Sequence, residues 1–244
     1  MPYISFFSTI ITLTFAGAVF GRYLEKQRTH LLFWTIGLLF YGLGTLSEIV
    51  MAYAFDATVL RMWYFSGAMM TAAWLGQGTI SLLVRKGNIA STLSTILLLF
   101  SLFALELVRA APITEAALAY EVAVPISAQY EEIMVRNGVM VVLTILLNVY
   151  GTIGLVGGAA YSAVIFWRKR VLANRMWGNV LLATGAFMPA LGGTFIRLGL
   201  PDWLYISELV GAGIMFAGYL QAIKPAPKKS ARRNTQTSAV ASAD

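Results

Sequence analysis

Residues 41–64 read YGLGTLSEIVMAYAFDATVLRMWY. The pattern predicts the end of one membrane-spanning helix, a turn of a few residues and the start of the next helix. Glu48 lies inside the first of these helices, where a charge is costly, and Arg61 opens the second. Ionisable residues at membrane depth are candidates for function by default, so the partner of Glu48 becomes the central question for this chain.

The composition places the whole chain in the membrane class. Of its 244 residues, 58% are hydrophobic and only 12% are charged, whereas soluble domains carry about 25% charged residues. The chain has no cysteine and a single histidine, His30. These counts exclude disulfides, thiolate catalysis, c-type haem attachment and metal sites built from cysteines or clustered histidines. We therefore expect no enzyme activity, no catalytic residue, no metal and no cofactor.

Seven apolar stretches are long enough to cross a bilayer, which takes roughly 20 residues. They lie at 3–23, 29–55, 59–84, 89–107, 137–167, 175–198 and 202–223. The sequence therefore predicts an all-α fold, a polytopic bundle of seven transmembrane helices over residues 1–223. The outer connection at 108–136 is long enough to cap the bundle, and a solvated spacer is the alternative. The basic tail at 224–244 lacks apolar periodicity and is expected to be disordered.

The basic residues predict the orientation of this bundle. If the N-terminus lies outside, fourteen of the eighteen Lys and Arg residues fall on the inner side. Cytoplasmic loops carry the excess of Lys and Arg, so we expect an outer N-terminus, a cytoplasmic C-terminus and a place in the plasma (inner) membrane. Anionic lipid headgroups are the expected contact of these basic helix ends, and nucleic acid is not an expected partner. Aromatic residues at the outer span ends fit an interfacial belt: Trp63, Tyr64, Trp203 and Tyr205.

The outer half of the bundle concentrates charge. Glu48 and Glu208 lie at a similar depth, roughly 10 Å from the outer helix ends at 1.5 Å per residue. Arg61 and Arg197 sit at the outer ends of neighbouring spans. Either the carboxylates pair with these arginines, which suits the forked guanidinium, or they hold protons and act as proton carriers or pH sensors. Ion pairs that only fix the helix register are the structural alternative.

Polar residues also lie deeper in two of the predicted spans. Trp63, Trp74 and Gln77 follow one approximate stripe of the span at 59–84, and Asn148 lies in a polar stripe of the span at 137–167. They are candidates for the wall of a pocket. Hydrogen bonds between helices are the alternative for Gln77 and Asn148, because membrane amides often join helices in this way.

Several short runs resemble a known family. The run LLFYGLG at 38–44, followed by Glu48 and by LRMWY at 60–64, resembles helices two and three of the seven-helix N-terminal sensor module of bacterial histidine kinases. The runs NR at 174–175, GAFMP at 185–189 and LGLP at 198–201 resemble helix six of that module and the turn after it. No dimerisation helix, phospho-accepting histidine or ATP-binding domain follows. The resemblance therefore implies a stand-alone sensor-like module that signals through a partner.

Three functional hypotheses follow. The first is a receptor-like or sensor-like protein that binds a small or lipophilic ligand in the outer half and signals through a partner protein. The polar end of its pocket is formed by Glu48, Arg61, Arg197 and Glu208, and its wall by Trp63, Trp74, Gln77 and Asn148. The second is a small proton-coupled transporter that uses Glu48 or Glu208. The third is a non-catalytic subunit of a membrane complex.

Overall fold

The computed structural model describes residues 2–84, 87–168 and 173–224, apart from the side chains of residues 2, 193, 196 and 197. These residues form helices, and their only strand-like pairing is an isolated bridge between Ile113 and Met134. The predicted all-α class is confirmed. The tail expected to be disordered lies outside the described residues from position 225 onward, and so does the side chain of Arg197.

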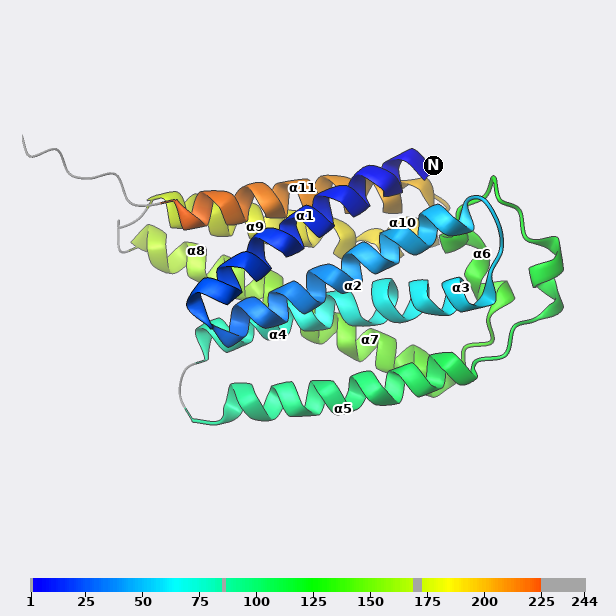
Figure 1. Ribbon diagram of the computed structural model, residues 1–244, viewed down its shortest axis with the longest axis horizontal. Helices are drawn as coiled ribbons and strands as arrows, with labels where there is room; N and C mark the ends of the chain where they lie inside the picture. The colour runs from blue at the N-terminus through cyan, green and yellow to red at the C-terminus, as the bar shows by residue number, and fades with distance from the viewer. Residues whose placement is uncertain (1, 85–86, 169–172, 225–244) are drawn as a thin grey trace, which may run out of the picture.

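The long helices lie side by side and alternate in direction (Figure 1). In chain order the elements are α1 (Pro2–Lys26), α2 (Thr29–Met51), α3 (Ala57–Trp63), the π-helix η1 (Tyr64–Met70), α4 (Thr71–Leu83), α5 (Ile89–Ala110), the 3-10 helix η2 (Glu115–Ala119), α6 (Ile126–Ile133), α7 (Gly138–Thr152), the π-helix η3 (Ile153–Gly157), α8 (Gly158–Arg168), α9 (Ala173–Ala190), α10 (Gly192–Arg197) and α11 (Asp202–Ile223).

Five helical stretches of the described chain are long and apolar enough to cross a membrane. They are Tyr3–Lys26, Thr29–Met51, Ile89–Ala110, Gly138–Arg168 and Asp202–Ile223. The chain is thus a helical membrane protein. The other two predicted spans, 59–84 and 175–198, are also helical, but they do not meet both the length and the hydropathy of a membrane-spanning helix.

Both exceptions have a physical reason. The rod formed by α3, η1 and α4 packs against α2, α5 and α7, and it buries polar side chains such as Ser66 and Gln77. A helix enclosed by other helices needs fewer apolar residues than one that faces lipid. The second exception is broken: α9 ends at Ala190, directly after Pro189, and α10 begins at Gly192. Proline removes a backbone hydrogen bond and favours such a break.

Local capping sets where the central hairpin turns. The Asp56 carboxylate accepts hydrogen bonds from the backbone N–H groups of Thr58 and Val59 at 2.7 and 2.9 Å. Satisfying these free N–H groups starts α3 at Ala57, and α2 ends earlier, at Met51. The turn is therefore slightly longer than the sequence predicts.

The connection at 108–136 is an ordered cap. We define the cap as residues 111–137, which contain η2 and α6. Ile126, Ile133 and Met134 are buried and belong to the same hydrophobic cluster as Trp63, Trp74 and Leu143 of the bundle. The cap lies at the end of the bundle that also holds the N-terminus and α10 (Figure 1). Of the two alternatives for this connection, the structure shows the cap and not the solvated spacer.

Candidate functional site

Glu48 is buried where three helices meet. Its side chain extends from α2 and is only 5% exposed. Ser5 of α1 donates its hydroxyl hydrogen to Oε2 at 2.8 Å, and the indole N–H of Trp63 in α3 donates to Oε1 at 3.1 Å. Both carboxyl oxygens therefore have a neutral donor.

Glu208 of α11 faces Glu48. The two carboxyl groups lie within hydrogen-bonding reach of each other. The phenol of Tyr41, seven residues before Glu48 on α2, donates to the backbone carbonyl of Glu208 at 2.8 Å and so ties α2 to α11. A second buried oxygen of Glu208, Oε2, has no hydrogen-bond partner among the described residues. Ionised carboxylates only accept hydrogen bonds, so a bond between these two groups requires a shared hydrogen.

The predicted pairing of Glu48 with Arg61 is not present. Arg61 instead donates from Nη2 to the backbone carbonyl of Ala111 at 2.9 Å. That carbonyl lies just past the C-terminus of α5, the negative end of the helix dipole, which favours a cation. In the described part of the chain, ion pairs join Glu106 to Arg109 and Glu131 to Arg136. Pairing with Arg197 stays a prediction, because its side chain lies outside the described residues.

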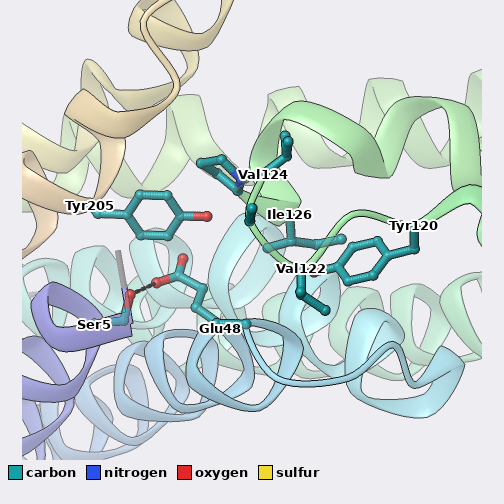
Figure 2. A pocket seen from close by; sticks show the side chains of 10 residues that line it. Ser5, Glu48, Tyr120, Val122, Val124, Ile126 and Tyr205 are labelled. Atoms are coloured by element: carbon teal, nitrogen blue, oxygen red, sulfur yellow. Dashed lines mark hydrogen bonds between the residues drawn. The ribbon is translucent and has the colours of Figure 1, made fainter.

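A small cavity opens beside Glu48, under the cap (Figure 2). Its wall is formed by Ser5, Glu48, Ala52, Tyr120, the segment 122–126 and Tyr205. Its volume is about 30 Å³, enough for one or two water molecules. Sites for drug-sized ligands hold roughly 300 to 1,000 Å³, so the cavity in this state fits only water or a very small ligand.

Tyr205 is a buried member of the site. It was expected in the interfacial belt, but it is only 3% exposed, and its ring lies next to the Glu48 carboxyl in Figure 2. Trp63, another predicted belt residue, is buried as well and donates to Glu48. Trp203 does lie exposed at the start of α11.

The deeper polar residues join helices and do not line this cavity. Trp74 donates to Ser101 at 3.1 Å, which links α4 to α5. The Gln77 amide donates to the Ala90 carbonyl and the Ser94 hydroxyl of α5, and it accepts from Tyr150 of α7. Asn148 donates to the backbone carbonyl of Ala68 at 2.6 Å. The alternative of interhelical hydrogen bonds therefore describes Gln77 and Asn148, and Trp74 makes a bond of the same kind.

Sequence reasoning missed Ser5 because the first span was treated only as an apolar anchor. A signal was available, since Ser5, Thr9 and Thr12 recur at the spacing of one helical face. All three are buried, and Thr9 donates to the Thr45 hydroxyl at 2.8 Å. This polar face of α1 packs on α2 directly beside Glu48.

Comparisons with protein-family models, with curated proteins and with solved structures find no match to this chain. The resemblance to a kinase sensor module therefore stays a prediction. In the described part of the chain, no group of three or more His, Asp or Glu side chains is arranged to hold a metal ion. The Glu48–Glu208 pair is the feature of this site with distinctive chemistry.

Proposed function

We propose that this protein is a sensor-like membrane protein that responds to protons at the cap side of the bundle. The observation that carries the proposal is the Glu48–Glu208 pair, in which two buried carboxyl groups face each other across α2 and α11. Ser5 and Trp63 add only neutral hydrogen bonds. We propose that a shared hydrogen holds the pair together, and that hydrogen is the proposed ligand.

Loss of the shared hydrogen would place two negative charges in contact. Two unit charges about 4 Å apart repel by roughly 4 kcal/mol at an effective dielectric constant of about 20. This energy is comparable to a large part of the roughly 5–15 kcal/mol that stabilises a typical domain. Deprotonation therefore supplies enough energy to separate α2 from α11, and this separation is the proposed signal.

The cavity volume supports a proton over a lipophilic ligand. The space beside Glu48 is about 30 Å³ in this state and admits water. A receptor for a larger molecule requires the cavity to open first. The proton needs no such opening, since Glu48 itself lines the cavity.

The packing below the pair favours sensing over transport. Toward the other end of the bundle, α2 and α11 pack Leu38, Ala212 and Met215 into a buried hydrophobic cluster with Phe15 of α1. A proton-coupled transporter must expose its carboxylates alternately to both sides. A sensor needs protons to reach the carboxyl pair from the cap side only. Transport is the second candidate, because it would use the same carboxyl pair.

The proposal includes the seven-span topology. The N-terminus and the cap share one end of the bundle, and the C-terminal ends of α1 and α4 share the other (Figure 1). Arg22, Lys26 and Arg28 flank the turn after α1, which supports a cytoplasmic position for that end. With the cap outside, the site faces the exterior of the plasma membrane, and the signal passes to a partner protein at the basic end, as in the sensor modules that the chain resembles.

The shared hydrogen is testable by infrared spectroscopy on the protein in lipid nanodiscs. We expect the carbonyl stretch of a protonated carboxylic acid in the wild type and its loss in the double variant Glu48→Gln/Glu208→Gln. Each single substitution should shift the band, because the hydrogen-bond partner changes. Glu106→Gln is the matched control, since Glu106 is exposed and paired with Arg109, and it should leave the band unchanged. A band that survives in the double variant refutes the shared hydrogen.

A proton-flux assay in liposomes separates the sensor from the transporter. The sensor reading expects the same proton permeability for wild type and Glu48→Gln. A flux that depends on Glu48 would favour the transporter instead. The sensor and the transporter both require the shared hydrogen, and therefore the infrared band. If the band is absent, the Glu48–Glu208 pair itself has been assigned wrongly, whatever the flux assay shows.

A further inference from the structure

One segment of the cap forms the outer wall of the cavity beside Glu48. We define the strap as residues 120–127, which run from Tyr120 to Ser127. It contributes Tyr120 and the segment 122–126 to the cavity wall, opposite Ser5 and Glu48 (Figure 2). The strap therefore separates Glu48 from the solvent on this side of the cavity.

A single glutamine holds the strap in shape. The side chain of Gln129 in α6 accepts from the backbone N–H of Glu121 at 3.0 Å. It also donates to the backbone carbonyls of Glu121 and Val124 at 2.9 and 2.8 Å. The middle of the strap has no regular secondary structure and is exposed at Glu121, Val122 and Ala123. Besides these three bonds, one backbone hydrogen bond, from Val124 N–H to the Glu121 carbonyl at 3.0 Å, holds its conformation.

The strap is tied at both ends to the helices that carry the carboxyl pair. Tyr120 donates its phenol hydrogen to the backbone carbonyl of Met51, the last residue of α2, at 2.7 Å. Its ring packs on Phe55 with 5.4 Å between ring centroids. At the other end, the buried Ser127 hydroxyl contacts the Tyr205 phenol of α11 at 3.5 Å. The first tie is short and the second is at the limit of a hydrogen bond.

The base of the cap is fixed more firmly than the strap. Ile113 and Met134 form the antiparallel bridge, and backbone hydrogen bonds flank it from Thr114 N to Ile133 O at 2.8 Å and from Val135 N to Pro112 O at 3.0 Å. The exposed middle of the strap, residues 121–123, can therefore move outward while the cap stays closed at its base and Ile126 stays in the core. Local opening of this kind is expected where few buried contacts hold a segment.

We propose that the strap is a latch that controls access from outside to the Glu48–Glu208 pair. Tyr120 fastens it to α2, Gln129 keeps it shaped to cover the cavity, and Ser127 marks its contact with α11. The latch rests on the proposed function for its purpose, since it decides when protons and water reach the sensor. Because its two ties lie on α2 and α11, a change in the spacing of these helices also acts on the latch.

The chain has no cysteine, so a single introduced thiol reports access directly. Ala52 lines the cavity and is half-buried. The test measures the labelling rate of Ala52→Cys in membranes with a membrane-impermeant maleimide. Adding Gln129→Ala removes three hydrogen bonds and should speed labelling by at least about tenfold, since opening becomes less costly. Adding Tyr120→Phe removes only one hydroxyl and should speed it by about fivefold.

Two controls make the result interpretable. Tyr53→Phe, at an exposed tyrosine of the same end of the bundle, should leave the rate unchanged. Leu118→Cys, at a side chain that is 92% exposed, gives the rate of an open site and should not respond to Gln129→Ala. Thermal unfolding of each variant checks that the bundle stays folded. If Gln129→Ala unfolds the protein, Tyr120→Phe still tests the latch, because it keeps the ring that packs on Phe55.

The latch is refuted if Ala52→Cys already reacts as fast as Leu118→Cys, or if neither Gln129→Ala nor Tyr120→Phe changes its rate. This outcome leaves the infrared band of the carboxyl pair untouched, so the proposed function survives it. If the infrared band is absent but Gln129→Ala speeds the labelling of Ala52→Cys, the opposite holds. The latch is then supported, and the shared hydrogen is refuted as the ligand.

Discussion

Tyr130 connects the cap to the carboxyl pair through a chain of ring contacts. Its ring lies 5.1 Å from the ring of Trp63, and Trp63 donates to Glu48. On the other side, the Arg136 guanidinium lies over the Tyr130 ring at 4.8 Å from its centroid, and Arg136 pairs with Glu131 at 2.9 Å. Such a cation–π contact contributes about 0.5–1 kcal/mol at partly exposed sites. The cap is thus attached next to Glu48 by an aromatic residue.

Burial raises the pKa of Tyr130, although the Arg136 charge opposes the shift. A raised pKa in the folded state stabilises the protein below the unfolded pKa of about 10. This stability is lost as the pH rises through the folded value, because the unfolded chain then holds fewer protons. We expect the melting temperature of the wild type to fall more steeply above about pH 10 than that of Tyr130→Phe. Equal slopes in calorimetric scans of the two proteins would contradict this role.

At the residue scale, the sequence predicted the depth of the charged residues in the bundle but not the partner of each one. Counting residues from the helix ends placed Glu48 and Glu208 at the same level, and the two side chains do meet. The choice of partner depends on how each helix is rotated about its axis, and one sequence does not fix that rotation. Arg61 is the clearest case: it turns toward the C-terminal end of α5 and not toward Glu48.

At the element scale, glycines set how closely the helices cross. A Cβ atom on Gly151 of α7 would lie 2.2 Å from the backbone carbonyl of Ala72 in α4. Glycine at this position lets the two backbones touch, as small residues do in membrane helix packing. Gly157 ends η3, which continues from α7, and a Cβ added there meets nothing within 4 Å.

These two glycines form a matched pair for mutagenesis. Gly151→Ala forces the backbones apart, and we expect it to destabilise the protein by roughly 1–3 kcal/mol, the usual range for overpacking. Gly157→Ala should be neutral or stabilising by up to roughly 1 kcal/mol, because alanine is the better helix former. Unfolding of both variants in mixed detergent micelles measures the difference. Similar losses in the two variants would show that the close crossing is not what Gly151 provides.

The positions of the elements were largely predictable, and their irregularities were not. The start of α2 at Thr29 follows from the apolar run length, whereas the break after Pro189 interrupts a span that was predicted as continuous. The π-helices η1 and η3 were not predicted, because the residues in them are the same apolar and small types that fill the α-helices beside them. The order of the cap was also undecided, since its buried side chains, such as Ile126 and Met134, are too few to show a pattern.

At the scale of the whole molecule, composition decides the class. A chain that is 58% hydrophobic and 12% charged has to bury its helices in lipid, and five helices of the described chain meet the length and hydropathy of a span. The sidedness follows from a weaker signal, the distribution of basic residues. The cap carries Glu115, Glu121, Glu131 and Glu132 but only one basic residue, Arg136. This contrast between the two ends is the basis of the predicted orientation.

Two single cysteines test that orientation in intact cells. Leu118→Cys lies on the cap, and Asn88→Cys lies exposed at the start of α5, at the opposite end of the bundle. The positive-inside rule predicts that an impermeant maleimide labels the first in intact cells and the second only after permeabilisation. The reverse pattern would put the cap in the cytoplasm, and the Glu48 site would then sense the interior of the cell. Labelling of both without permeabilisation would mean that the ends of α5 share one side, which a single crossing of the membrane by α5 forbids.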